Sequence, residues 1–138
     1  MVFDIIYLIN GRSTFAVSAA YMIAAGVIRG RLAAVFGLID WLAIPTGSRA
    51  KRIGLLHGSG NVVVVVLFAV SWLLRANAHD RKPGAAALVC SFAGLVLGAV
   101  TAWLGGELVE RLGVGVDDGA GVNAPSSLSG AKSAPGGR

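Results

Sequence analysis

The chain has 138 residues, of which 55% are hydrophobic and only 14% are charged, and its formal net charge is +5. A soluble domain carries about 25% charged residues, so this composition excludes an ordinary soluble protein. Three apolar runs, at residues 14–45, 53–75 and 84–109, reach the ~20 residues that a helix needs to cross a bilayer. We therefore predict an all-α integral membrane protein, a small helical bundle of three full transmembrane helices plus an N-terminal helical stub.

The positive charge does not indicate a nucleic-acid partner. Lys and Arg residues stand at the ends of the predicted spans, where topology and lipid head groups favour them. No basic helix or strand with interleaved aromatic residues is present, as a nucleic-acid surface would require. The composition therefore predicts the lipid bilayer, and no nucleic acid, as the environment of this chain.

The stub at residues 1–9 is apolar but too short to cross a membrane. It ends at Asn10-Gly11-Arg12-Ser13, which is a turn signal and offers Ser13 as the N-cap of the next helix. We expect the stub to be either a helix in the membrane interface or the end of a span.

The first long run, residues 14–45, is interrupted by Arg29-Gly30-Arg31. A hairpin turning there would have two arms of about 22 Å each, and neither arm would cross the bilayer. We therefore predict a single tilted helix that ends at Pro45. Counting back from Pro45 puts Arg29 roughly 6–10 Å inside the opposite interface, within snorkelling reach, with Arg31 deeper.

The remaining chain divides into loops, spans and a tail. A short basic loop at residues 46–52 precedes the second span, and a polar loop at residues 75–83 precedes the third. We predict a transmembrane domain over residues 1–112 and a disordered Gly/Ser/Pro-rich tail over residues 113–138. The basic loop contains no acidic residue, which favours the cytoplasmic side for this loop and for the tail.

Polar residues inside the spans are the candidate site, because each one costs free energy in lipid. Alternating helix directions bring five of them, from three helices, to one side of the membrane. They form either buried pairs that fix helix register, Asp40–His57 and Glu107–Arg111, or a site for a ligand or a proton. No nucleophile–base set and no metal-ligand spacing is present, so we expect neither an enzyme nor a metal site. The five candidates are Asp40, His57, Asn61, Glu107 and Arg111.

Small residues recur at about four-residue intervals on the first and third spans. Such stripes allow helix backbones to approach closely in lipid. We predict helix packing at Gly26, Gly30, Gly37, Gly94, Gly98, Ala102 and Gly106.

Several of these residues also form a pattern across the chain. It comprises Asp40-Trp41, the basic loop with Arg49 and Arg52, His57 with Asn61, and the closing stretch from Trp103 to Val116. This pattern resembles the bacterial predicted membrane family called domain of unknown function 2231, over residues 3–118. The resemblance implies the bacterial cytoplasmic membrane and four spans, and some members are joined to Rieske-type iron–sulfur or other redox domains. The His-Pro segment that opens the family's first span is missing here, which implies that residues 1–9 are the end of that span.

We predict a non-enzymatic membrane module that assembles with another membrane protein or as a homo-oligomer. One alternative, implied by the redox-linked members, is a protein that holds a b-type haem or a quinone near His57. A single intramembrane histidine, however, supplies only one axial ligand per chain. The other alternative is a small proton or solute transporter that uses Asp40, His57 and Glu107, although these residues lie at one end of the spans.

Overall fold

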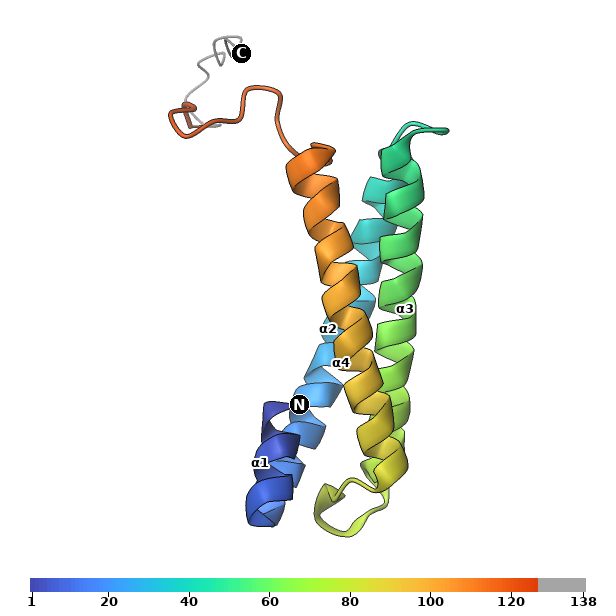
Figure 1. Cartoon of the computed structure of the whole chain (residues 1–138), viewed down its shortest axis with the longest axis vertical. Helices are drawn as coiled ribbons and strands as arrows, with labels where there is room; N and C mark the ends of the chain where they lie inside the picture. The colour runs from blue at the N-terminus through green and yellow to red at the C-terminus, as the bar shows by residue number, and fades with distance from the viewer. Residues whose placement is uncertain (127–138) are drawn as a thin grey trace.

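The computed structural model describes residues 1–126, and its architecture is a set of long helices (Figure 1). No strand occurs in this part of the chain. Helices α2, α3 and α4, the last with its extension η2, are each long and apolar enough to cross a membrane. The predicted fold of three spans and an N-terminal stub is therefore confirmed. The elements are α1 (Val2–Asn10), α2 (Ser13–Ala43), α3 (Arg49–Ala76), the 3₁₀ turn η1 (His79–Arg81), α4 (Ala85–Gly106) and the π-helical turn η2 (Glu107–Arg111).

Helix α2 is one continuous helix of 31 residues, as predicted, and Arg29-Gly30-Arg31 does not interrupt it. It ends at Ala43 because Ile44, which precedes Pro45, adopts an extended conformation. The prediction of Ser13 as N-cap is wrong. Arg12 holds that position, and no side chain caps the helix; Ser13 is already its first helical residue.

Helix α3 begins earlier than the apolar run does. Ser48 caps it by accepting a hydrogen bond from the backbone N–H of Lys51 at 3.0 Å. Residues 49–52, which we predicted to belong to a loop, therefore form the first turn of the helix. At the other end of the chain, residues 113–126 form only turns and bends, and the rest of the predicted disordered tail lies outside the described residues.

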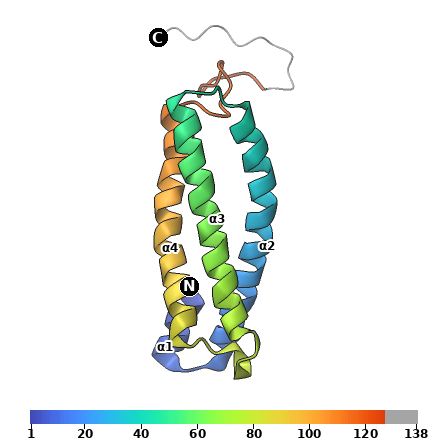
Figure 2. The same cartoon turned by 90° about the vertical axis from the view of Figure 1, so that its right-hand side faces the viewer.

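The three long helices stand side by side, with α3 between α4 and α2, and α1 lies against the first part of α2 (Figure 2). Small residues allow α3 and α4 to approach closely. A Cβ on Gly94 would lie 3.2 Å from the ring of Phe68, and one on Gly98 would lie 3.9 Å from Val64. These two predicted packing glycines therefore lie in the interface between α3 and α4.

Not all of the predicted packing residues lie between helices. A Cβ on Gly30 would lie 2.8 Å from Val65 of α3, so this glycine does allow close packing of α2. The rest have open space or an exposed side chain because α2 is covered by α3 on one side only, and because two residues of α4 lie beside the packed positions Thr101 and Gly105 rather than on the face toward α3. These are Gly26, Gly37, Ala102 and Gly106.

The contact of Gly30 with Val65 also relates the depth of α2 to that of the apolar run of α3. Along α3, Val65 lies about 18 Å from Ile53, where the apolar run begins, and about 15 Å from Arg75, where it ends. Gly30 is therefore close to the mid-plane of the bilayer, and Arg29 and Arg31 stand on either side of it. If the apolar run of α3 spans the bilayer, Arg29 lies about 15 Å from an interface, deeper than the roughly 6–10 Å that counting back from Pro45 predicted.

The difference in the depth of Arg29 arises from the residue of α2 that is taken as the edge of the hydrocarbon core. The prediction took Pro45 as the edge of the hydrocarbon core. In the structure the Lys51 ammonium donates a hydrogen bond of 2.6 Å to the carbonyl oxygen of Trp41, and the Trp41 indole N–H donates one of 3.0 Å to the carbonyl of Lys51. The polar first turn of α3 thus lies level with residue 41, so polar groups begin beside Asp40 rather than at Pro45.

Candidate functional site

His57 and Asn61 lie on one face of α3, as their spacing predicts, and both contact Thr101 of α4. The Nδ1 atom of His57 is 2.8 Å from the backbone oxygen of Thr101, and its Nε2 atom is 3.1 Å from the amide nitrogen of Asn61. The hydroxyl of Thr101 lies 3.0 Å from Oδ1 of Asn61. These three residues therefore form a closed ring of hydrogen bonds between two helices.

The hydrogen-bond partner of Nδ1 shows that this nitrogen of the His57 ring carries a proton. A carbonyl oxygen only accepts hydrogen bonds, so Nδ1 carries the proton that is donated to Thr101. Nε2 faces the Asn61 amide, and the single hydroxyl proton of Thr101 has two acceptors, Asn61 Oδ1 and the Gly98 carbonyl oxygen, each 3.0 Å away. The carbonyl partner therefore places a proton on Nδ1 of His57, and each polar group of the three residues has a partner.

Two glycines make space for this ring of hydrogen bonds. A Cβ on Gly60 would lie 2.5 Å from the Thr101 methyl group, and a Cβ on Gly105 would lie 2.9 Å from Cε1 of His57. Any side chain at either position would push α3 and α4 apart. Neither glycine belongs to the predicted packing set, because sequence alone does not show which glycines face a side chain of the neighbouring helix.

Glu107 forms a second group near the same end of α4. Its Oε1 atom accepts a hydrogen bond of 2.6 Å from Arg49 of α3, and its Oε2 atom is 3.4 Å from Nε of Arg111. The Glu107 side chain is only 11% exposed, whereas Arg49 is 56% exposed. The pair Glu107–Arg111 was expected from its spacing, and Arg49 is an additional partner from the first turn of α3.

Asp40 does not join either group. Its side chain is exposed, and no hydrogen bond or ion pair connects it to another residue among residues 1–126. The expected pair Asp40–His57 is therefore not formed, because Trp41 rather than Asp40 contacts α3 at this end of α2. The five predicted residues form two separate groups and one isolated carboxylate rather than one cluster.

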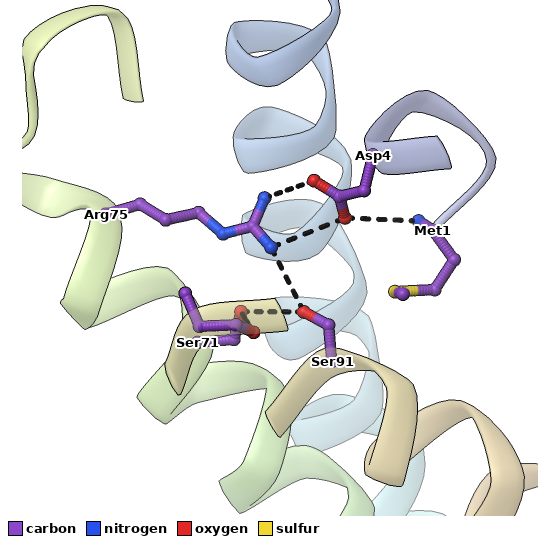
Figure 3. A network of polar contacts seen from close by, with 6 residues as sticks. Met1, Asp4, Ser71, Arg75 and Ser91 are labelled. Carbon is purple, nitrogen blue, oxygen red and sulfur yellow. Dashed lines mark hydrogen bonds and ion pairs between the residues drawn. The ribbon is translucent and has the colours of Figure 1, made fainter. Parts of the chain in front are cut away.

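The largest buried polar network lies at the opposite end of the bundle and was not predicted as a site (Figure 3). Asp4, Ser71, Arg75 and Ser91 are fully buried and come from α1, α3 and α4. Arg75 donates from Nη1 to Asp4 Oδ1 at 2.6 Å, and from Nη2 to Asp4 Oδ2 at 3.3 Å and to Ser91 at 3.2 Å. This network attaches the short helix α1 to α3, and α3 to α4.

The two serines complete the network, and the acceptor of each hydroxyl proton is defined. Ser71 donates its proton to the carbonyl oxygen of Ala87 at 2.7 Å. The contact of 2.6 Å between Ser71 and Ser91 must then use the proton of Ser91, which at the same time accepts from Arg75. Nε of Arg75 has no partner among residues 1–126. The sequence did carry one signal for this site, because a carboxylate in the apolar stub requires a countercharge.

A family model for predicted membrane proteins, DUF2231, matches residues 1–118. The chain belongs to this family. No curated protein and no solved structure matches the chain. Membership in DUF2231 agrees with a multi-pass membrane protein and confirms the resemblance drawn from the sequence.

The environment of His57 in this DUF2231 protein does not fit an axial ligand of haem. Both ring nitrogens are engaged, Nδ1 with Thr101 and Nε2 with Asn61. The backbone of Gly105 lies close against the ring, where even a methyl group would clash. A porphyrin would have to displace Asn61 and separate α3 from α4. The arrangement holds two helices together and leaves no free nitrogen for iron.

Proposed function

We propose that this DUF2231 protein is a non-enzymatic assembly module that binds another protein chain within the membrane through helix α2. The observation that carries the proposal is the exposed second half of α2 together with its charges. All residues from 31 to 40 are exposed, and Arg29 is exposed as well. Apolar side chains on such a face are satisfied by lipid, but two arginines near the mid-plane are not.

The other helices do not present a comparable face. The apolar groove on α4, lined by residues such as Phe92, Val96 and Val100, contains no charged side chain. Lipid tails satisfy a surface of this kind. The polar residues of α3 and α4 are bonded to one another across their interface, at His57 and at Glu107. Helix α2 is therefore the surface that supports binding of a further chain.

Photocrosslinking in native membranes tests this proposal. A photoreactive amino acid replaces Val35 of α2, which is 57% exposed, and in a matched control it replaces Val96 of α4, which is 67% exposed. We expect a defined protein adduct from position 35 and only lipid adducts from position 96. Lipid adducts alone at both positions, or equal protein adducts at both, would contradict the proposal.

A further inference from the structure

The two arginines of α2 lie where a charge is most costly in a bilayer. Gly30 contacts Val65 near the middle of α3, and the adjacent Gly98 of α4 lies against Val64 at the same depth. Arg29 and Arg31 therefore stand near the mid-plane, about 15 Å from either interface. An arginine side chain covers only about half of that distance by snorkelling. Head groups and bulk water do not reach these guanidinium groups.

Nothing in the described part of the chain neutralises them. Arg29 and Arg31 are exposed, and no hydrogen bond or ion pair joins either of them to another residue among residues 1–126. They lie on the two sides of the face that contacts α3, each about 100° around the helix from Gly30. Each therefore points to a surface of α2, on one side of α3, that a further helix packed against α2 could cover.

A second copy of the chain does not supply the missing countercharge. The chain has seven acidic residues, and all of them lie near an end of the bundle or beyond it. Asp4 is buried against Arg75, and Glu107 is held by Arg49. Turning a second copy upside down leaves these residues at the ends. The acidic residues are Asp4, Asp40, Asp80, Glu107, Glu110, Asp117 and Asp118.

We propose that α2 binds a transmembrane helix of a different protein, and that this helix carries an Asp or Glu near its middle that pairs with Arg29 or Arg31. The inference rests on the proposed assembly function and specifies the chemistry of the partner. A carboxylate at mid-depth forms a bidentate pair with a guanidinium group, and each neutralises a charge that lipid does not tolerate. Specificity for this partner follows from the depth of the charge, because an acid near the interface does not reach the arginines.

The test uses the full-length chain in lipid nanodiscs and three synthetic transmembrane peptides of Leu and Ala. One peptide has Glu at its centre, one has Gln there, and one has Glu near its end. Association is measured by fluorescence energy transfer from a dye on the chain to a dye on the peptide. We expect the central-Glu peptide to bind about tenfold more tightly, or better, than the other two.

Variants of the chain identify the residues that bind. The double variant Arg29→Gln/Arg31→Gln should lose the preference for the central-Glu peptide, whereas Arg52→Gln, an exposed basic residue at the end of the bundle, should retain it. Helical circular dichroism and SDS resistance verify that each variant is folded; neither should fall, because no contact within residues 1–126 is lost.

The outcomes separate the partner chemistry from the assembly function itself. Equal binding of the Glu and Gln peptides, or a preference that survives in the double variant, would overturn the carboxylate proposal. Energy transfer could also occur between two labelled copies of the chain and not depend on the arginines. That result would overturn the proposal that the partner is a different protein, but it would leave assembly through α2 intact. Assembly itself is decided by the crosslinks at position 35.

Discussion

The buried pair Asp4–Arg75 allows a quantitative prediction. Both side chains are fully buried, and the guanidinium group makes two hydrogen bonds to the carboxylate, at 2.6 and 3.3 Å. Removing one partner leaves an uncompensated buried charge, which costs about 3–5 kcal/mol. Replacing both partners by apolar residues of similar size removes the desolvation penalty together with the attraction, and such replacements are often neutral or stabilising.

A double-mutant cycle measures this coupling. We expect Asp4→Leu and Arg75→Met each to lower the free energy of unfolding by about 3–5 kcal/mol, and the double variant to recover most of the loss. The free energy is obtained from SDS titrations in mild detergent, followed by tryptophan fluorescence. As a control, Arg49→Gln breaks the pair with Glu107, and because Arg49 is 56% exposed the loss should stay below about 1 kcal/mol.

The result that refutes this reasoning is additivity. If the double variant loses the sum of the two single effects, the charges do not stabilise one another, and the attachment of α1 depends on other contacts. A single variant Asp4→Leu that unfolds no more easily than the Arg49→Gln control would lead to the same conclusion.

Three further predictions concern the packing of α3 against its neighbours. Gly60→Ala should lower the free energy of unfolding by about 1–3 kcal/mol, because its Cβ would lie 2.5 Å from a methyl group of α4. The control Gly58→Ala, with nothing within 4 Å of its Cβ, should be neutral or stabilising by up to about 1 kcal/mol. Equal effects of the two substitutions in the same SDS titrations would contradict the packing of Gly60 against α4. Thr101→Val should cost about 1 kcal/mol through loss of its hydroxyl, but ¹⁵N spectra should still show the Nδ1–H tautomer of His57, because the ring binds the backbone oxygen at position 101. A change of tautomer would show that the Thr101 hydroxyl, rather than the backbone oxygen, determines which nitrogen of the His57 ring carries the proton. Lys51→Met should lower the free energy of unfolding by about 0.5–1.5 kcal/mol, because the Lys51 ammonium binds a carbonyl at the end of α2 and lies 4.0 Å from an indole ring. An unchanged SDS midpoint would show that Lys51 does not stabilise this contact between α2 and α3.

The helices of this fold are predictable because lipid forces the backbone to bond within itself. An apolar run of sufficient length must be a helix, and even the β-branched run at residues 62–66 is helical here. The ends of the helices are less predictable. Residues 49–52 are polar and were assigned to a loop, but a cap at Ser48 makes them helical. Hydropathy reports where lipid lies, whereas capping determines where a helix begins.

The polar groups were predicted only where the information is local. The spacing of His57 and Asn61 places them on one face, and the structure agrees. Which face of α2 meets α3 is set by packing between helices, so the sequence did not reveal that Trp41 rather than Asp40 contacts α3. Asp4 and Arg75 are separated by 71 residues, and no local pattern links them. The sequence therefore identified which residues cost free energy in lipid, but not which of them bind and neutralise one another.

The contact between Asp4 and Arg75 also bears on the order in which this protein is assembled. Translation and membrane insertion proceed from the N-terminus, so Asp4 enters the membrane region well before Arg75 does, and Ser91 follows later still. Until then, α1 lacks the guanidinium group that neutralises its carboxylate. Helix α1 therefore gains the partner of its carboxylate only after α3 has been synthesised. Helix α1 is thus synthesised before it is fixed, and interruption of synthesis before residue 75 leaves Asp4 without its partner.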